Sequence, residues 1–484
     1  MNTVSDSRLA AEADAVPLCV DLDGTLVGTD SLYEAFFALL KRHPLLAVRF
    51  PLWLSRGRAC LKARVAEALP LDPRKAPYAA DVVDFVHGEK AQGRTILLVT
   101  GADERVARGV ADHLGLFDQI MASDGITNLS GRRKAEALRR RFGPRGFDYI
   151  GNCKKDLSVW RQARTAHVVT ASDELTRKAG EVSSIGRVFA RQAAGLEAWL
   201  GALRMHQWLK NLLVFVPLLA GQALFDASAL SASIVAFLSY SLLASGTYVI
   251  NDLCDLGVDR EHPGKRRRPL ASGRLLPSDG IRLAGGLVAL ALLLGLFLPW
   301  SFGLVLALYF AATLSYSLRL KQAMLIDVVL LAGLYTLRIL AGSAATGIPL
   351  SSWLLAFSMF LFFSLALVKR YSELFTSEMA GGKGLSGRGY RAEDVNTVVS
   401  LGAASGFVAV LVLVLYINSE VAAGSYSRPA LLWIPCVGLL YWISRAWMVV
   451  ARREMHDDPL IWAARDQLSR WTILICVAAV ATAV

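Results

Sequence analysis

Two short stretches of the sequence carry acidic residues at spacings that suit metal and phosphate chemistry. DLDGT, at residues 21–25, has two aspartates separated by one residue at the end of an apolar run. NDLCDLGVDREHPGKRRRPLASG, at residues 251–273, has three aspartates followed by a run of cations. Carboxylate oxygens bind Mg²⁺, and Arg and Lys bind phosphate oxygens, so both stretches predict sites for phosphorylated substrates.

In the longer stretch the acidic residues are spaced for one face of a helix. They stand at i, i+3 and i+7, with an asparagine four residues before the second: Asn251, Asp252, Asp255 and Asp259. Neighbouring carboxylates without interleaved cations repel each other, which predicts a divalent cation among them. The cations that follow are Lys265, Arg266, Arg267 and Arg268. Such a set suits the binding and release of a diphosphate. An ordinary cytoplasmic loop would explain the cations but not the spacing of the acids.

In the shorter stretch, alternation along a strand would place Asp21 and Asp23 on the same side, where both could approach one metal ion and one phosphate. A tight turn after a buried strand is the structural alternative, because Asp and Gly are also turn residues.

The surrounding motifs resemble the haloacid dehalogenase superfamily. The resemblance implies that Asp21 is a nucleophile that becomes an aspartyl-phosphate and that Asp23 is the general acid/base. It implies that Thr100 in TILLVT binds the phosphoryl group and that Lys134 in GRRKAEAL neutralises its charge. In GNCKKD it makes Asp156 a Mg²⁺ ligand; Asn152 stands where the family has an aspartate and would offer a neutral oxygen.

The elements that would hold this first site alternate between strands and helices. PLCVDLDG, TILLVTGA, FDYIGN and AHVVTAS read as strands, which predicts a parallel α/β, Rossmann-like sheet over residues 1–185. An insert at about 30–85 would form a small helical cap, and its apolar stretches suggest contact with the membrane. Residues 186–204 are predicted to be an amphipathic linker.

Residues 205–484 are predicted to form an all-α, polytopic membrane domain. Hydrophobic residues make up 54% of the chain and concentrate here in long runs. About nine spans are expected, near 210–226, 230–250, 281–299, 302–318, 324–346, 352–368, 397–418, 429–449 and 471–484. The net charge of +12 lies largely in alternate loops, which indicates the positive-inside pattern rather than nucleic-acid binding. The N-terminus lacks a signal-peptide core, so we expect a cytoplasmic (inner) membrane protein with its N-terminal domain in the cytoplasm.

NDxxDxxxD after a second span, within nine spans, is similar to the UbiA-type intramembrane prenyltransferase superfamily. RMHQWLKN, YSLRLKQ and DPLIWAARDQLS resemble its polyprenyl-phosphate phosphoribosyltransferase branch, although Met205 and His206 depart from that branch's pattern. The resemblance implies Mg²⁺, phosphoribosyl pyrophosphate and a polyprenyl phosphate as cofactor and substrates. Asp252, Asp255 and Asp259 would hold Mg²⁺, with Asn251 orienting or ligating.

Cations elsewhere in this domain are assigned to the substrates' phosphates. Lys265, Arg266 and Arg268 would bind the pyrophosphate or ribose phosphate. The polyprenyl phosphate would lie near Lys210, Arg319, Lys321, Lys369 and Arg370, with Asn211 in register with the branch's motif. Asp327 and Arg338 share a face of one span, and charges at membrane depth usually mark functional sites. The alternative for these two is a buried structural pairing with other helices.

The combined expectation is a bifunctional enzyme. The membrane domain would transfer 5-phosphoribose to the lipid phosphate, and the N-terminal domain would remove the 5-phosphate. Two alternatives stay open: transfer of a prenyl chain to an aromatic or other small acceptor, and an N-terminal domain that is a scaffold without turnover. The sequence does not fix the oligomeric state, and a homo-oligomer is one possibility.

Overall fold

The computed structural model describes residues 16–191, 194–379, 389–455 and 458–483. The chain divides into two compact units. One comprises Met1–Leu203 with Tyr248–Leu283, and the other comprises Arg204–Thr247 with Ala284–Val484. Each unit is described separately.

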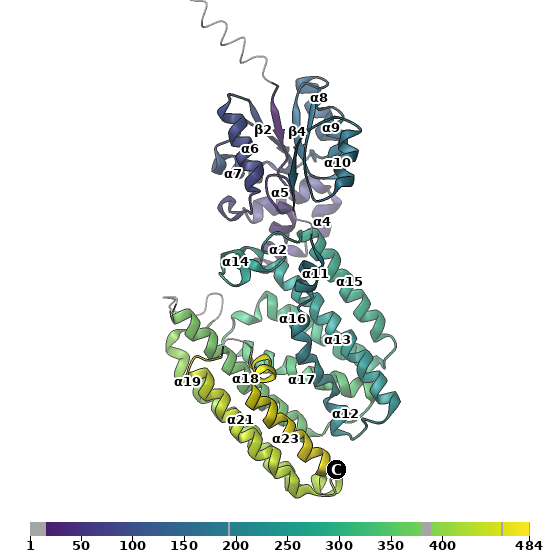
Figure 1. Ribbon diagram of the computed structural model, residues 1–484, viewed down its shortest axis with the longest axis vertical. Helices are drawn as coiled ribbons and strands as arrows, with labels where there is room; N and C mark the ends of the chain where they lie inside the picture. The colour runs from purple at the N-terminus through teal and green to yellow at the C-terminus, as the bar shows by residue number, and fades with distance from the viewer. Residues whose placement is uncertain (1–15, 192–193, 380–388, 456–457, 484) are drawn as a thin grey trace, which may run out of the picture. The chain divides into compact units, whose positions relative to one another are not determined.

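The first unit contains the predicted parallel sheet. Its six strands lie in the order β3-β2-β1-β4-β5-β6, and every pair is parallel. They are β1 (Leu18–Val20), β2 (Ile96–Asp103), β3 (Gln119–Ser123), β4 (Asp148–Gly151), β5 (Thr165–Thr170) and β6 (Ser184–Ala190). The helices of this sheet are α6 (Ala80–Ala91), α7 (Glu104–Leu114), α8 (Arg132–Phe142), α9 (Leu157–Trp160) and α10 (Asp173–Gly180). Figure 1 shows α6 and α7 on one side of the strands and α8, α9 and α10 on the other.

Successive side chains of a strand point to opposite faces of the sheet and pack into two separate hydrophobic cores. Leu18 and Val20 pack into the core that includes α6 and α7, whereas Cys19 packs into the core that includes α8 and α9. Both faces of the central strands β1, β2 and β4 are therefore buried, as expected of parallel strands with crossover helices.

The register of the central strands brings Asp21 and Thr100 to the same edge of the sheet, the one formed by the carboxyl ends of the strands. Val20 of β1 pairs with Leu98 of β2 and with Ile150 of β4. Asp21 directly follows β1, and Thr100 lies two residues beyond Leu98. Ligands of open α/β sheets bind at such carboxyl ends, so this edge is the place to look for a site.

The predicted cap is present and helical. It consists of α2 (Ser31–Arg42), α3 (Pro44–Ala47), α4 (Phe50–Ser55), α5 (Arg58–Ala68) and the 3-10 turn η1 (Pro73–Lys75). Asp30 caps α2, since its carboxylate accepts from the backbone N–H groups of Leu32 and Tyr33. The chain thus leaves the sheet edge through the DLDGT turn and enters the cap within a few residues.

The sheet continues beyond the predicted end of this domain at residue 185. Residues Ser184–Ala190, which begin the predicted linker, form the edge strand β6. Helical structure begins only at α11 (Leu196–Leu203). Backbone pairing with β5 explains the difference, because ladder hydrogen bonds can impose a strand on a segment of mixed local preference.

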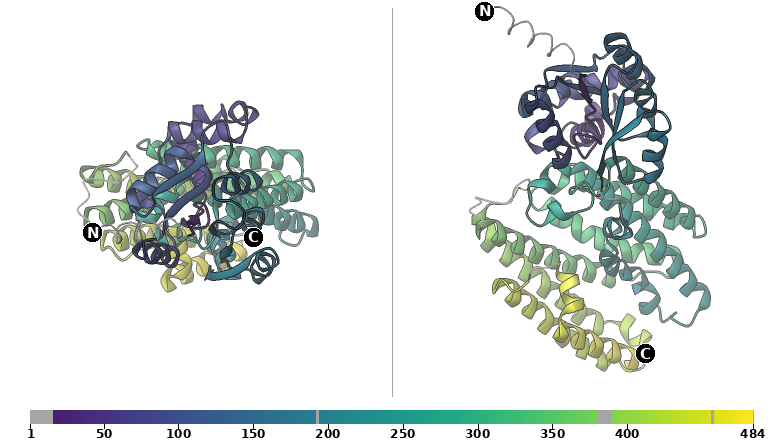
Figure 2. Two further views of the ribbon diagram at one scale, coloured as in Figure 1. Left: turned by 90° about the horizontal axis from the view of Figure 1, so that it is seen from above. Right: turned by 45° about the horizontal axis from the view of Figure 1, so that its top comes forward.

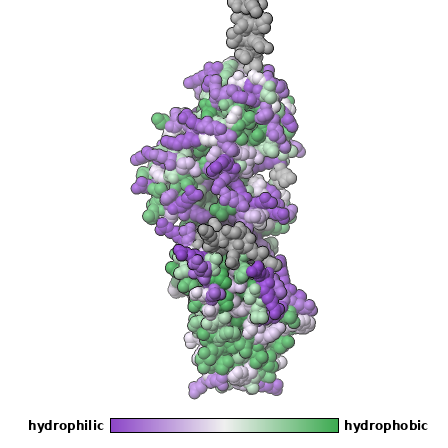
Figure 3. Space-filling model, turned by 90° about the vertical axis from the view of Figure 1, so that its left-hand side faces the viewer, coloured by the Kyte–Doolittle hydropathy of each residue, from purple (hydrophilic) through white to green (hydrophobic). Residues whose placement is uncertain are grey.

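In the part of the chain that the structure describes, seven helices are long and apolar enough to cross a membrane. Their element bounds are α13 (Ala227–Cys254), α15 (Pro277–Gly295), α16 (Trp300–Leu318), α17 (Ile326–Thr346), α18 (Ser352–Met379), α19 (Val395–Ile417) and α21 (Trp433–Ala451). Figure 2 shows helices of the second unit lying side by side, and Figure 3 shows the apolar surface that they present. The shorter helices are α12 (Val216–Ala220), α14 (Leu256–Glu261), α20 (Glu420–Ser425), α22 (Pro459–Arg465) and α23 (Gln467–Ala483). Seven of the nine predicted spans are therefore matched by long apolar helices.

The first and last predicted spans differ from expectation. The ninth corresponds to α23, a shorter apolar helix of 17 residues. The first is a 3-10 segment, η3 (Met205–Phe215), followed by five residues of α12. Pro217 removes a backbone donor near its end, and η3 packs so closely on α17 that a Cβ at Gly342 would lie 1.9 Å from the carbonyl oxygen of Val214. Close packing against α17 therefore accounts for why this apolar segment is not a regular membrane-spanning helix.

Candidate active sites

Asp21 lies at the centre of a buried network at the sheet edge. Its Oδ1 accepts from Lys134 Nζ at 2.7 Å and from the backbone N–H of Leu22 at 2.9 Å. Lys134, on α8, also donates to the Tyr149 hydroxyl at 2.8 Å. Burial raises the pKa of Asp21 to about 6, although the Lys134 ammonium acts in the opposite direction. The predicted nucleophile and the predicted charge-neutralising lysine are thus in direct contact.

Asp23 has a different environment from Asp21. Its Oδ1 accepts from the backbone N–H of Ser31 at 2.9 Å, at the start of α2. Burial, followed by the neighbouring carboxylates of Asp30 and Asp21, raises the pKa of Asp23 to about 7. Both carboxylates are oxygen donors of the type that Mg²⁺ prefers, and a pKa of about 7 also lets Asp23 exchange a proton near neutral pH.

The other residues predicted for this site stabilise its loops. The Oγ1 atom of buried Thr100 accepts from the backbone N–H of Ala102 at 3.0 Å. Asp156 accepts from the backbone N–H groups of Asn152 and Cys153, both at 3.0 Å, and from the Tyr149 hydroxyl at 3.1 Å. These bonds fix the loop after β4 and, through Tyr149, connect it to Lys134.

Asn152 lies against the DLDGT turn. A Cβ at Gly24 would lie only 2.0 Å from Asn152 Nδ2, and Gly24 has a φ of +74°. Both the backbone conformation and the close approach of Asn152 therefore require glycine at residue 24. The structure places Asn152 beside the predicted metal site, where its amide oxygen is available by type as a Mg²⁺ ligand.

A cation from the cap reaches the same edge of the sheet and was not predicted from the sequence. Lys62, on α5, donates to the carbonyl oxygen of Gly101 at 2.5 Å and to Asn128 Oδ1 at 3.0 Å. Burial lowers its pKa, while Asp23 and Asp30 act in the opposite direction. Lys62 belongs to no motif, so only the fold of the cap reveals its position.

In the Asp-rich stretch the helical spacing continues through a break. α13 ends at Cys254 and α14 begins at Leu256, but the backbone N–H of Asp255 still bonds to Asn251 O at 2.9 Å. The next such bond runs from Asp259 N to Asp255 O at 2.8 Å. The face predicted for the aspartates is therefore largely retained.

Arg268 joins the first and third aspartates. Its Nη1 atom donates to Asp252 Oδ1 at 3.1 Å and to Asp259 Oδ2 at 2.6 Å. Asp255 is paired with Lys41 of α2 at 2.5 Å. Arg268 was predicted to bind the substrate's phosphates, whereas here it neutralises carboxylates predicted to hold the metal.

These carboxylates fit Mg²⁺ by donor type. Asp252 and Asp259 are buried oxygen donors held near one guanidinium, and a divalent cation satisfies such carboxylates more fully than a single guanidinium does. Within the described residues, no three His, Cys, Asp or Glu side chains are close enough to form a ready metal cluster. Of the cations that follow, Lys265 is half-buried and Arg266 is exposed.

A second charged cluster lies in the other unit and contains two predicted lysines. Lys210 Nζ donates to Asp458 Oδ2 at 2.7 Å, and Lys369 Nζ donates to the same oxygen at 3.3 Å. Lys210 also lies over the ring of Tyr335, 5.7 Å from its centroid. Burial alone would raise the pKa of Asp458, but the two ammonium groups outweigh it and hold this pKa well below its ordinary value. Two cations thus share one carboxylate.

Asp458 was not assigned a role from the sequence. It caps α22, since its Oδ1 accepts from the backbone N–H of Leu460 at 3.3 Å, and Pro459 follows at the first helical position. An aspartate directly before a proline is a helix-start signal, which could have located the turn but not its lysine partners.

Asn211 and Arg338 form a separate buried contact. Arg338 Nε donates to Asn211 Oδ1 at 2.8 Å, and Asn211 Nδ2 donates to Ser241 Oγ at 2.9 Å. The guanidinium also lies over three aromatic rings at 5.2–5.5 Å from their centroids: Tyr240, Tyr309 and Tyr335. Arg338 is therefore held by an amide and by aromatic faces.

Asp327 pairs with another helix rather than with Arg338. Its Oδ2 lies 3.0 Å from Nε of Arg370, and both side chains are fully buried. Tyr390 donates to Asp327 Oδ1 at 2.6 Å, and Arg370 also bonds to Glu373. This arrangement favours the structural interpretation of Asp327 and Arg370. The remaining predicted cations, Arg319 and Lys321, are exposed and half-buried, respectively.

Comparison with known proteins agrees with both halves of this architecture. Residues 212–482 match the UbiA prenyltransferase family, and residues 18–161 match the haloacid dehalogenase-like hydrolases. The protein is thus an integral membrane transferase with a haloacid dehalogenase-like domain. Because the first match covers more than half of the chain, the protein belongs to the UbiA prenyltransferase family.

Individual relatives extend over different parts of the chain. The protein y4nM of Sinorhizobium fredii is 36% identical over 461 residues, covering 95% of this chain and 89% of its own length. The decaprenyl-phosphate phosphoribosyltransferase of Mycolicibacterium smegmatis is 38% identical over 186 residues, covering 38% of this chain and 58% of its own length. Among solved structures, a UbiA homologue from Archaeoglobus fulgidus bound to GPP and Mg²⁺ is 18% identical with a TM-score of 0.46, covering 59% of this chain and 99% of its own.

Proposed function

We propose that the membrane domain transfers 5-phosphoribose from phosphoribosyl pyrophosphate to a polyprenyl phosphate and releases pyrophosphate. The observation that carries the proposal is the cluster in which the ammonium groups of Lys210 and Lys369 share the single carboxylate of Asp458. Lys210 is buried and Lys369 is half-buried. Their excess of positive charge suits an anionic acceptor, and the lipid phosphate is one. The similarity to a decaprenyl-phosphate phosphoribosyltransferase supports the same assignment.

In this reaction an oxygen of the lipid phosphate attacks the anomeric carbon of the ribose. A new C–O bond forms as the bond to pyrophosphate breaks. A phosphate monoester is already ionised at neutral pH, so positioning and electrostatics suffice and no general base is required. Asp252, Asp255 and Asp259 would hold Mg²⁺, which supplies charge neutralisation for the leaving diphosphate. Arg268, already at these carboxylates, would bind the outer phosphate oxygens.

The N-terminal domain is proposed to remove the 5-phosphate from the lipid-linked product. Asp21 would attack the phosphorus to form an aspartyl-phosphate, and Lys134, 2.7 Å away, would neutralise charge on the phosphoryl oxygens. With a pKa of about 7, Asp23 can hold a proton for the leaving alcohol and later accept one from the attacking water. Water then releases inorganic phosphate and restores Asp21.

The location proposed for the protein is the inner membrane, with the N-terminal domain on the cytoplasmic side. This follows from the basic residues of alternate loops, among them Arg268, Arg319 and Arg452. Both reactions would then take place on one side of the bilayer, and the product of the first would be available to the second.

The deciding experiment uses the purified protein in detergent with Mg²⁺, a polyprenyl phosphate and phosphoribosyl pyrophosphate, and follows the lipid product by mass. A phosphoribosyl or ribosyl lipid is expected, and its phosphate count reports on the N-terminal domain. Consumption of a prenyl diphosphate with an aromatic acceptor, without use of phosphoribosyl pyrophosphate, would overturn the proposal. The competing account is an N-terminal domain without catalytic activity, because Asn152 stands where the family has an aspartate. That account predicts that no phosphomonoester is hydrolysed.

A further inference from the structure

The outer face of the cap is apolar and lacks a partner within the described residues. On α3 and α4, Leu45 and Val48 are 79% and 77% exposed, and Leu52 and Leu54 are 54% and 52% exposed. Neither helix has a buried residue. Together α3 and α4 form a short apolar segment, Pro44–Ser55, within the cap.

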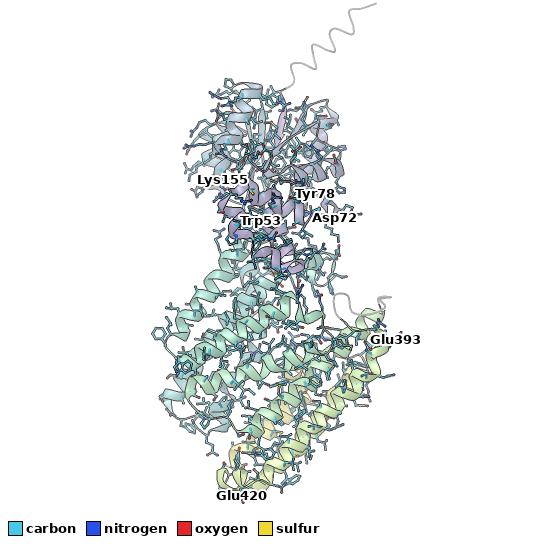
Figure 4. The ribbon with its side chains drawn as sticks, turned by 180° about the vertical axis from the view of Figure 1, so that it is seen from behind. Trp53, Asp72, Tyr78, Lys155, Glu393 and Glu420 are labelled. Atoms are coloured by element: carbon cyan, nitrogen blue, oxygen red, sulfur yellow. The ribbon has the colours of Figure 1, made fainter. Side chains whose placement is uncertain are left out.

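This face is held in place by contacts on its other side. The ring of Phe50 packs edge-on against Phe36 of α2, with centroids 4.5 Å apart, and lies 5.4 Å from the ring of Trp53. Trp53 is labelled in Figure 4. These aromatic contacts anchor α4 to α2, and Leu52 and Leu54 of the same helix remain more than half exposed.

The charge of the same segment is entirely basic. Residues 35–66 contain no Asp or Glu. The exposed cations that flank or interrupt the apolar face are Arg42, Arg49, Arg56 and Arg58. Large apolar side chains interleaved with arginines are typical of segments that lie in the interface of an anionic bilayer, where the apolar groups enter the acyl boundary and the cations contact lipid phosphates.

We propose that this face of α3 and α4, which we call the cap's lipid face, binds the surface of an anionic phospholipid bilayer. A bilayer is the fitting partner because the chain itself carries seven candidate membrane-spanning helices, so a membrane is always within its reach. A protein partner would need acidic groups to match the arginines, but phospholipid headgroups supply that charge without a specific sequence.

The lipid face has a direct connection to the sheet-edge site. α5 follows α4 after Gly57 and carries Lys62, which donates to Gly101 O in that site. A cap that rests on the bilayer would therefore hold one wall of the site at the lipid surface. This consequence, unlike membrane binding itself, rests on the proposed function, since it concerns a phosphomonoester carried by a lipid.

The primary test is photocrosslinking of the full-length protein in nanodiscs that contain phosphatidylglycerol. The photoreactive residue benzoylphenylalanine replaces Leu52, with a matched control at Arg140, an exposed residue of α8. We expect lipid adducts at residue 52, several-fold fewer of them in purely neutral lipid, and none at residue 140. Adducts to a second copy of the chain, no adducts, or equal adducts at both positions would overturn the proposal.

A kinetic test separates this inference from the proposed function. The double variant L45S/L52S should lower hydrolysis of a lipid-linked phosphomonoester in bilayers by about tenfold, because each leucine contributes transfer free energy to membrane binding. Hydrolysis of a small water-soluble phosphomonoester should stay unchanged. Equal rates with the lipid substrate would contradict the link to catalysis, whereas absence of hydrolysis in the parent protein would refute the phosphatase proposal and leave the crosslinking result standing.

Discussion

Two charge clusters of this protein carry excess charge of opposite sign, negative at the sheet edge and positive in the membrane unit. At the sheet edge, burial and neighbouring carboxylates raise the pKa values of Asp21 and Asp23, so negative charge there is undercompensated. In the membrane unit, Lys210 and Lys369 share Asp458, so positive charge is in excess. This contrast in charge agrees with the proposed ligands: a metal cation with a phosphoryl group at the first cluster, and an anion alone at the second.

Neither imbalance is favourable for folding by itself. Removing charges from water costs several kcal/mol per ion, and the attraction between partners only partly offsets this cost. A chain selected for stability alone would replace such groups with apolar residues of similar volume. Their presence at protected positions therefore supports a functional interpretation of both clusters.

The largest expected effect is on the sheet-edge cluster. The variant Asp21→Asn loses the nucleophile, so phosphomonoester hydrolysis should fall about 1,000-fold or more, while pyrophosphate release by the membrane domain persists. Phosphate release and the mass of the lipid product are the measurements. Asp118→Asn is the matched control, since Asp118 pairs with Lys90 outside the cluster. Wild-type hydrolysis in Asp21→Asn would show that Asp21 is not the nucleophile.

The second prediction concerns the Asp-rich stretch. Asp252→Asn removes one of two carboxylates joined by Arg268, and the transferase rate should fall about 100-fold because charge neutralisation of the diphosphate is worth several kcal/mol. Pyrophosphate release at increasing Mg²⁺ is the measurement. Asp279→Asn, which affects an exposed pair with Arg282, should change the rate little. An unaltered rate and Mg²⁺ requirement in Asp252→Asn would remove this stretch from the site.

The third prediction tests the excess of positive charge around Asp458. Lys210→Met removes one of the two cations, so the KM for polyprenyl phosphate should rise about tenfold, as expected for loss of a charged hydrogen bond, with little change in the KM for phosphoribosyl pyrophosphate. Arg445→Met breaks an ion pair with Asp466 in the same unit and controls for a loss of stability. An equal rise in both KM values would indicate a general structural defect instead.

The smallest expected effect concerns a carboxylate outside both clusters. Asp148 is paired with Arg164 at 2.7 Å and with Arg94. Burial would raise its pKa, but the two guanidinium groups outweigh it, so the pKa in the folded state lies below the ordinary value. The stability contribution of Asp148 is therefore complete above about pH 4 and is lost as the pH falls through the folded-state pKa.

Asp148→Asn should accordingly lower the free energy of unfolding by about 1–3 kcal/mol at pH 7. Thermal unfolding of the full-length protein at pH 7, and at pH values that fall from about 4 through the folded-state pKa of Asp148, is the measurement. The difference between the variant and the parent should shrink at the lower pH values. A difference that grows as the pH falls would contradict the assigned direction of the shift.

The sequence predicted those features that depend on local pattern. Strand alternation and the DLDGT turn located Asp21, and the parallel register of β1 and β2 places Asp21 and Thr100 at the same edge of the sheet. The structure also brings Asp21 and Lys134 into contact, and their catalytic roles stay predictions. Long apolar runs located seven spans, because length and hydropathy are properties of the segment itself.

Features that depend on the packing of distant segments were not predicted. Lys62 joins the sheet-edge site only because α5 folds over it, and Asp458 meets Lys210 across 248 residues of sequence. Arg370 was predicted to bind lipid phosphate, but its guanidinium, on α18, pairs with Asp327 of α17. The partner of a charged side chain is set by tertiary contacts, which spacing along the chain does not encode.

The contact between Gly342 and the carbonyl of Val214 limits how the membrane domain can move. At that point no side chain separates α17 from η3. The two segments therefore cannot slide past one another by a change of side-chain rotamer, and such a movement would produce backbone clashes. Lys210 and Asn211 on η3 and Arg338 on α17 are thus attached to one stiff body.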